Sequence, residues 1–357
     1  MKVGILTLRL YDNYGGILQN YALCKVLTDM GLEVESFHLL QPISLRRMLK
    51  NILPHKENSN DRRLINKTFS FIQNYIPQTK YKIRFLFQLR IDPRIRKYDA
   101  YIVGSDQVWR RAYMEYGLKN MFLGFIKNPC KIKISYAASF GVDDIAEYSN
   151  KDICKVRKYL SSFKGLSVRE SFGCGICRDV FGANAVQVLD PTFLLPVSHY
   201  CAMALSGTTQ SDGNLLVYFL DETDVKKRIL NIVATHGNGY VPFYYNTFAY
   251  DVNAPSVHQW LRGFYDADFI LTDSFHGCVF SIIFNKPFVV IGNENRGLSR
   301  FISLLSLFGL EDRMIKHSNC MDVNKVLMNK IDWEDVNGRL ESLKMTSFLF
   351  LKQNLSE

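Results

Sequence analysis

The sequence of 357 residues lacks several features that mark common classes of protein. No apolar run approaches the roughly 20 residues of a membrane-spanning helix. The opening residues read as a strand and reach the polar pair Asp12 and Asn13 too early for a signal peptide. The HExxH, GxSxG and P-loop motifs are absent, so a zinc protease, an α/β-hydrolase or a P-loop ATPase finds no support. We therefore expect a cytoplasmic protein.

Cysteine is sparse, with eight residues in the whole chain, and most of them lie inside apolar segments. This distribution is typical of buried free thiols in a reducing compartment. Cys174 and Cys177 have CxxC spacing, but no second CxxC and no matching histidine pair completes a zinc site. We expect neither a metal nor a cofactor.

Positive charge is present in excess and is concentrated in one segment. The net charge is +10, and residues 46–97 hold fourteen Lys and Arg against three acids. Aromatic and aliphatic residues are interleaved there, which predicts amphipathic helices in a basic excursion over residues 43–97. Such helices contact anionic membranes or acidic substrates, and a solvated basic face is the alternative. The segment is thus a candidate for peripheral contact with the inner face of the membrane. Nucleic acid is not expected, because no binding motif accompanies the charge.

Short apolar segments alternate with helical patterns in both halves of the chain, which predicts parallel sheets. Residues 195–213 contain Pro196, Gly207 and Gly213 among polar residues and predict a linker, after which the alternation restarts. The fold class is therefore α/β, with two Rossmann-like domains facing a cleft. The first domain covers residues 1–195, including the basic excursion, and the second covers 196–357 and ends in a helical tail.

The first polar turn of the chain precedes a predicted helix over residues 16–30. It contains Asn13, Gly15 and Gly16, and Gln19 follows within the helix. Glycine allows a ligand to approach the backbone closely, and Asn13 can bind substrate or cap the helix. We predict that these four residues bind a substrate.

Two later strand ends carry charged residues. Asp106 and Gln107 follow an apolar strand, and a carboxylate beside an amide suits a polyhydroxylated ligand. Asp106 is a candidate base for a hydroxyl, and Gln107 is a candidate ligand for the same substrate. Arg169 follows another strand, where an arginine can bind a carboxylate or phosphate through two hydrogen bonds. An ion pair with Glu170 is the alternative.

The polar turn TDSFHG follows a predicted buried strand over residues 268–271 and precedes an apolar helix. His276 is expected in the first helical turn, where unpaired backbone N–H groups attract anions. A histidine there can transfer a proton near neutral pH, and capping of the turn is the alternative. Arg296 and Arg300 open a further helix and are candidate anion ligands.

Five motifs, in this order, resemble the polysaccharide pyruvyl transferase family. They are NYGGILQNYAL from Asn13, YIVGSDQ from Tyr101, SVRE from Ser167, LDPT from Leu189 and TDSFHG from Thr272. The resemblance runs from about residue 1 to 315 and implies a GT-B-like fold. It also implies transfer of pyruvate from phosphoenolpyruvate to a sugar of a polysaccharide or of its lipid-linked precursor, which forms a ketal and releases phosphate.

The resemblance implies roles for individual residues as well. Arg169 matches the anion-binding arginine of the family, and His276 matches the histidine proposed as general acid. Many members have an arginine two positions before this histidine, where the present chain has Ser274. We expect Arg296 or Arg300 to supply that charge, which places Arg169, Ser274, Arg296 and Arg300 at the donor. The resemblance also makes the sugar the acceptor, which we expect to be bound by Asn13, Gly15, Gly16, Gln19 and Gln107. A GT-B glycosyltransferase with a nucleotide-sugar donor and a non-catalytic sugar-binding relative are the alternatives.

Overall fold

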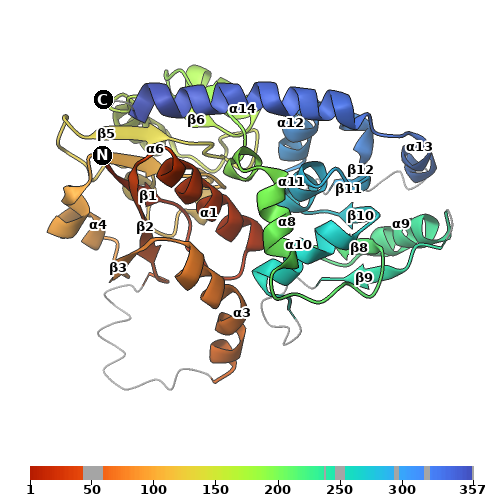
Figure 1. Cartoon of the computed structure of the whole chain (residues 1–357). Coiled ribbons are helices and arrows are strands. Elements are labelled where there is room, and N and C mark those ends of the chain that lie inside the picture. The colour runs from red at the N-terminus through yellow and green to blue at the C-terminus, as the bar shows by residue number, and fades with distance from the viewer. Residues whose placement is uncertain (43–58, 237–238, 246–253, 293–296, 317–321, 356–357) are drawn as a thin grey trace. The chain divides into compact units, whose positions relative to one another are not determined.

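The computed structural model describes residues 1–42, 59–236, 239–245, 254–292, 297–316 and 322–355. These residues form two compact units, each with its own parallel five-stranded sheet (Figure 1). Unit 1 comprises Met1–Arg63, Phe69–Leu194 and Leu343–Glu357, and unit 2 comprises Leu64–Thr68 and Leu195–Ser342. Part of the predicted basic excursion, residues 43–58, and the candidate ligand Arg296 lie outside the described residues.

The sheet of unit 1 has the strand order β3-β2-β1-β4-β5, and all of its pairs are parallel. Its strands are β1 (Lys2–Leu6), β2 (Glu33–Leu39), β3 (Gln78–Ile83), β4 (Ala100–Val103) and β5 (Ile132–Ser135). The chain builds outward from β1 to β3 and then returns to the other side of β1. Loops therefore diverge between β1 and β4, and such a switch point is where open α/β sheets bind ligands.

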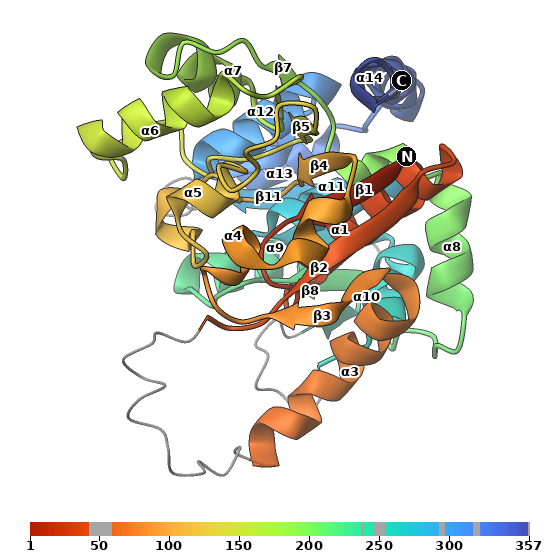
Figure 2. The ribbon, with the colours of Figure 1, turned by 90° about the vertical axis from the view of Figure 1, so that its left-hand side faces the viewer.

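Successive side chains of each strand point to opposite faces of this sheet. On one face Leu6, Tyr101 and Val103 join an apolar core that includes Trp109, whose ring stacks on Phe122. Short elements cover this face, as Figure 2 shows for α4. The helices that belong wholly or mostly to unit 1 are α1 (Tyr14–Asp29), α3 (Ser59–Tyr75), α4 (Gln88–Ile91), α5 (Leu118–Met121), α6 (Asn150–Leu160) and α7 (Ser171–Gly175).

Smaller elements complete unit 1. Two short parallel strands, β6 (Ser167–Val168) and β7 (Val186–Gln187), pair with each other, and an isolated bridge joins Val168 to Ala138 after β5. The turn after β5 therefore lies between the strand ends that carry Asp106 and Arg169. The remaining turns are η1 (Pro93–Lys97), η2 (Arg111–Tyr113), the π-helical η3 (Ile176–Val180) and η4 (Pro191–Leu194).

The sheet of unit 2 has the order β12-β11-β10-β8-β9 and is also parallel throughout. Its strands are β8 (Leu215–Tyr218), β9 (Pro242–Tyr244), β10 (Phe269–Thr272), β11 (Phe288–Gly292) and β12 (Met314–Lys316). The chain passes from β8 to β9 on one side and then to β10 on the other, so the switch point lies between β8 and β10. All residues of β8, β10 and β11 are buried, which explains their continuous apolar sequences.

Helices connect the strands of unit 2. They are α8 (Val197–Leu205), α9 (Asp224–Thr235), α10 (Val257–Asp266), α11 (Phe275–Ile283), α12 (Leu298–Phe308) and α13 (Asp322–Met328), with the turn η6 (Glu311–Arg313) before β12. The helix α8 corrects one expectation, because it occupies part of the predicted linker over residues 195–213. Tyr200 and Met203 of α8 are buried, and this packing outweighs the turn-forming residues on either side.

The C-terminal helix α14 (Trp333–Leu355) corrects the predicted domain boundaries, because its second half belongs to unit 1. Ser347 accepts a hydrogen bond from the backbone N–H of Leu189 at 3.1 Å. The ring of Phe350 lies 6.3 Å from that of Tyr136. These contacts join residues that are far apart in the sequence, so no local pattern could assign the predicted tail to its unit.

The predicted fold class is confirmed, since the chain is α/β with two Rossmann-like parallel sheets. The predicted strands and helices around the candidate residues are present, and helix α3 forms within the basic excursion. Among the described residues, no helix combines the length and apolar character needed to cross a bilayer.

Candidate functional site

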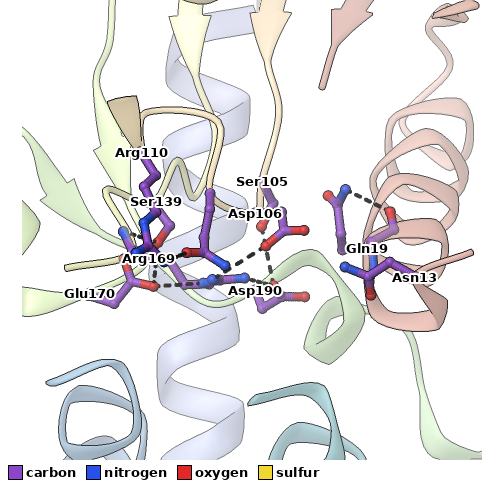
Figure 3. Close-up of polar contacts among 12 residues, drawn as sticks. Asn13, Gln19, Ser105, Asp106, Arg110, Ser139, Arg169, Glu170 and Asp190 are labelled. Atoms are coloured by element: carbon purple, nitrogen blue, oxygen red, sulfur yellow. Dashed lines mark hydrogen bonds and ion pairs between the residues drawn. The ribbon is translucent and has the colours of Figure 1, made fainter. Parts of the chain in front are cut away.

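The first group of candidate residues lies at the switch point of unit 1, beyond the carboxyl ends of β1 and β4. Asn13 caps α1, because its side chain accepts a hydrogen bond from the backbone N–H of Gly16 at 3.0 Å. A Cβ atom on Gly16 would lie 3.3 Å from Asn13 and 3.4 Å from the Oδ2 atom of Asp106. Glycine at this position therefore lets Asp106 come close to the first turn of α1, as Figure 3 shows. Gly15 lies in the same buried turn.

Gln19 lies one turn further along α1 and is 1% exposed. Its Nε2 atom donates to the carbonyl oxygen of Gly16 at 2.9 Å and to the hydroxyl of Thr7 at 3.3 Å. Its Oε1 atom accepts no hydrogen bond from the part of the chain that the structure describes. A buried amide oxygen that lacks a donor is costly, so this atom is suited to a ligand hydroxyl.

Asp106 has a left-handed backbone conformation, with φ at 73°. Its carbonyl oxygen accepts hydrogen bonds from Val108 at 2.7 Å and from Ser139 at 3.0 Å, which hold this turn in place. A non-glycine residue in this region costs free energy and is often found at functional sites. The side chain is buried, with the residue 6% exposed.

Gln107 does not point into the group around Asp106. Its Oε1 atom accepts a hydrogen bond from Arg110 at 3.2 Å, and a Cβ on Gly141 would meet the same atom. The structure therefore brings Asn13, Gly16 and Asp106 together but places the Gln107 amide beside Arg110. Its role at the acceptor stays a prediction.

Arg169 is enclosed by three carboxylates (Figure 3). Its guanidinium lies 2.9 Å from Glu170, 3.0 Å from Asp190 and 3.8 Å from Asp106. Burial lowers the pKa of Arg169, but the three negative charges outweigh this effect and raise it overall. The guanidinium is therefore permanently charged, and its surroundings carry more negative than positive charge.

The partners of Arg169 are themselves held by hydrogen bonds. Ser139 donates to Glu170 at 2.8 Å, and Ser105 donates to Asp190 at 3.2 Å. The backbone N–H of Thr192 donates to the other oxygen of Asp190 at 3.1 Å. Glu170 and Asp190 are thus fixed, and the longer contact to Asp106 is the one a substrate can most easily alter.

Sequence reasoning assigned no role to Ser105, Ser139 and Asp190, and it considered Glu170 only as an ion-pair partner of Arg169. Each of them follows a strand or an isolated bridge, and Glu170 and Asp190 stand within motifs of the family resemblance. A polar residue shortly after a buried strand or bridge is the signal that could have identified Ser105, Ser139 and Glu170, whereas Asp190 stands three positions after the partly exposed β7. The predicted alternative for Arg169, an ion pair with Glu170, is present in the structure.

The second group lies at the switch point of unit 2. Ser274 caps α11, because its hydroxyl accepts a hydrogen bond from the backbone N–H of Gly277 at 3.3 Å. A Cβ on Gly277 would lie 2.1 Å from the hydroxyl of Thr272, so the turn requires glycine there. His276 therefore stands in the first turn of α11, as the sequence predicted.

His276 and Arg300 share one neighbour, the ring of Phe275. The rings of Phe275 and His276 are 5.4 Å apart and nearly perpendicular. The guanidinium of Arg300, in the first turn of α12, lies 5.8 Å from the Phe275 ring. A histidine and an arginine at the starts of two helices thus lie near one aromatic side chain, and both helix starts are suited to an anion.

A buried lysine fixes the turn that precedes His276. Lys226 is 1% exposed, and its Nζ atom lies 2.5 Å from the Oδ2 atom of Asp273 and also contacts the carboxylate of Asp221. The other oxygen of Asp273 accepts the backbone N–H of Leu220 at 2.6 Å. Burial raises the pKa of Asp273, and the ammonium of Lys226 opposes that shift. Asp273 thus ties the end of β8 to the end of β10.

Within the described residues, no three His, Cys, Asp or Glu side chains are grouped so that they could hold a metal ion. Cys174 and Cys177, which have CxxC spacing, are free thiols, and burial raises the pKa of both. The two groups described above consist instead of acid–base and hydrogen-bonding side chains.

The sequence comparison decides the family. The model of the polysaccharide pyruvyl transferase family matches residues 13–295, which contain every motif of the resemblance. The chain belongs to this family. No curated protein sequence matches the chain.

Solved structures with low sequence identity share the fold. The UDP-GlcNAc 2-epimerase of Methanocaldococcus jannaschii has a TM-score of 0.56 at 13% identity, with 98% of this chain and 99% of that chain covered. The UDP-GlcNAc 2-epimerase of Neisseria meningitidis, solved with UDP-GlcNAc, has a TM-score of 0.53 at 10% identity, with 100% of both chains covered. The N-terminal domain of Candida albicans trehalose-6-phosphate phosphatase has a TM-score of 0.55 at 10% identity, covering 99% and 96%. These likenesses confirm a GT-B-like fold.

Proposed function

We propose that this pyruvyl transferase family member transfers pyruvate from phosphoenolpyruvate to a sugar of a polysaccharide or of its lipid-linked precursor. The product is a cyclic ketal across two sugar hydroxyls, and phosphate is released. One observation carries the proposal: within the matched region, each unit presents an acid–base side chain at its switch point, Asp106 in unit 1 and His276 in unit 2.

The donor side of the proposal rests on unit 2. Phosphoenolpyruvate carries a carboxylate and a phosphate, for which the first turn of α11 and the guanidinium of Arg300 are suitable ligands. His276 protonates the methylene carbon of the donor, which leaves a positively polarised carbon at C2. Arg296, which precedes α12 in the sequence, is a second candidate for the anion.

The acceptor side rests on unit 1. Asp106 takes a proton from a sugar hydroxyl, whose oxygen then bonds to C2 of the protonated donor. Asn13, Gly15, Gly16 and Gln19 bind the remaining hydroxyls and ring, and the unpartnered Oε1 atom of Gln19 accepts one of them. A second hydroxyl then attacks C2, the C–O bond to phosphate breaks, and the proton of that hydroxyl leaves with the phosphate.

The contacts of Arg169 and Ser274, two predicted donor ligands, support roles other than direct binding of the donor. Arg169 is enclosed by carboxylates, so an incoming dianion would meet negative charge before it reached the guanidinium. Its geometry supports a positioning role, in which it orients Asp106. Ser274 supports the first turn of α11 as its cap, so the arginine typical of the family is replaced here by a helix-stabilising residue.

The purified protein tests this function directly. It is incubated with phosphoenolpyruvate and candidate oligosaccharide or lipid-linked acceptors, and phosphate release is measured together with the mass of the acceptor. We expect release that depends on the acceptor, together with an acceptor product that has gained pyruvate and lost water. Turnover of UDP-GlcNAc or another nucleotide sugar, without phosphate release from phosphoenolpyruvate, would support the glycosyltransferase alternative and refute the proposal.

A further inference from the structure

Unit 1 carries a surface that its candidate site does not use. It is formed by the segment after β3, residues 84–97, together with residues 119–131 around α5. Three large apolar side chains protrude from it: Leu86 is 42% exposed, Phe87 is 40% exposed and Ile91 is 63% exposed. Three such residues within one short segment form an apolar patch that water solvates poorly.

Positive charge surrounds the same patch. Arg84, Arg90, Arg96, Lys119 and Lys127 have no carboxylate within ion-pair distance among the described residues, although many other cations of unit 1 do. Arg94, which is paired with Asp92, shows the contrast within the segment. Five uncompensated cations on one surface favour an anionic partner.

Two hydrogen bonds make this surface one structural feature. The side chain of Asn120, in α5, donates to the carbonyl oxygen of Leu86 at 2.9 Å and accepts from Arg90 at 3.5 Å. Figure 2 shows α4 and α5 beside each other on this side of the sheet. Burial lowers the pKa of Lys119, and the charges of Arg90 and Lys127 lower it further, so the cations are close enough to repel one another. An anionic partner would relieve that repulsion.

A cavity opens within the surface, at the amino ends of β4 and β5. Its volume is about 340 Å³, and Leu89, Tyr101 and Phe125 contribute apolar walls. Arg96 and Lys127 also line it and supply positive charge, and Lys131, which is paired with Asp99, completes the lining. The candidate residues of unit 1 follow the carboxyl ends of its strands, so this hollow is a separate feature at the opposite edge of the sheet.

These observations together identify the partner. A second copy of this chain would bring the same positive charge and be repelled. A nucleic acid would match the charge, but of the three protruding side chains only Phe87 could stack on a base, and the aliphatic Leu86 and Ile91 could not. A bilayer with anionic head groups matches both properties, because apolar side chains enter the interface while Lys and Arg contact the head groups.

We propose that this surface docks unit 1 on an anionic lipid bilayer, with Leu86, Phe87 and Ile91 in the interface and the five cations against lipid head groups. The docking does not depend on the transfer reaction. It would hold the protein where a lipid-linked acceptor is found.

Co-sedimentation with large unilamellar vesicles of phosphatidylcholine, with or without 30% phosphatidylglycerol, tests the docking. The charge variant carries Arg84→Gln, Arg96→Gln and Lys127→Gln. The matched control carries Lys151→Gln, Lys155→Gln and Lys158→Gln, exposed lysines of α6 on the same unit. We expect the full chain to bind anionic vesicles at least tenfold more tightly than neutral ones. The charge variant should lose at least tenfold, since each Lys or Arg near such a surface contributes about fivefold, and the control should lose much less.

A second variant distinguishes binding to a bilayer from binding to other polyanions. It carries Leu86→Ser, Phe87→Ser and Ile91→Ser and keeps every charge. Weaker binding of this variant to anionic vesicles supports insertion into the interface. Unchanged vesicle binding by this variant would overturn the proposal in favour of a purely electrostatic polyanion site. Equal losses for the charge variant and its control, or equal binding of the full chain to neutral vesicles, would also overturn it.

Thermal unfolding of each variant tests whether the fold is retained. We expect it to be retained, because all substituted side chains are at least partly exposed. Phosphate release with a soluble acceptor should be unchanged in all three variants. A protein that binds vesicles but transfers no pyruvate would refute the proposed function and leave the docking intact.

Discussion

The switch points of the two units hold opposite chemistry on related scaffolds. In unit 1 three carboxylates surround the single guanidinium of Arg169. In unit 2 His276 and Arg300 stand at the first turns of two helices, each near the ring of Phe275. Position within an α/β sheet thus marks where a site forms, while the charges at that position decide which substrate it suits. The acidic point suits sugar hydroxyls, and the basic point suits a small dianion.

The largest effect is expected at the basic switch point. His276→Gln removes the proposed proton donor and should lower pyruvyl transfer by about 10²- to 10⁴-fold. Circular dichroism should show an unchanged fold. His236→Gln, at the C-terminal end of α9 and so at the opposite edge of the sheet, is the control and should retain activity. Wild-type activity in His276→Gln would remove this residue as the acid.

Arg169→Met tests whether the acidic point is a clamp or an anion site. The substitution leaves three carboxylates near one another without their guanidinium. The free energy of unfolding, measured in denaturant, should therefore fall by about 3–5 kcal/mol. Arg178→Met breaks a similar pair with the adjacent Asp179 on the surface and should cause no measurable loss. A stable Arg169→Met protein with a raised KM for phosphoenolpyruvate would instead support the predicted donor role of Arg169.

Asp106→Asn keeps the shape of the side chain and removes its charge and basicity. Transfer should fall by about a hundredfold, because a positioned base contributes at least that much. The KM for phosphoenolpyruvate should stay the same, which separates this residue from the donor ligands. Asp144→Asn, at an exposed position of the same unit, is the control. A loss confined to donor affinity would contradict the division between the two switch points.

Ser274→Ala should have the smallest effect. Loss of the cap on α11 lowers the free energy of unfolding by about 1 kcal/mol. Ser256→Ala removes the comparable cap of α10 and should cost about the same. If capping is the only role of Ser274, both variants should bind phosphoenolpyruvate equally well. Weaker donor binding in Ser274→Ala alone would add a ligand role to the cap.

The local part of the structure could be predicted from the sequence. The alternation of apolar segments and helical patterns indicates both parallel sheets, and the turn before α11 places His276 in the first helical turn. The cap formed by Asn13 follows from the polar turn before α1. These features depend on residues within a few positions of one another, so the hydrogen bonds and the periodicity that produce them can be predicted from the sequence.

The contacts of Arg169 were decided by the tertiary structure. Its three carboxylates come from residues 106, 170 and 190, and strand order brings two of them across the unit. The clamp of Lys226 on Asp273 and the return of α14 to unit 1 arise in the same way. The sequence by itself determined the elements, the family and the candidate residues. Only the tertiary structure decided which charged side chains form ion pairs, because an ion pair depends on a distance in space that cannot be read from positions in the sequence.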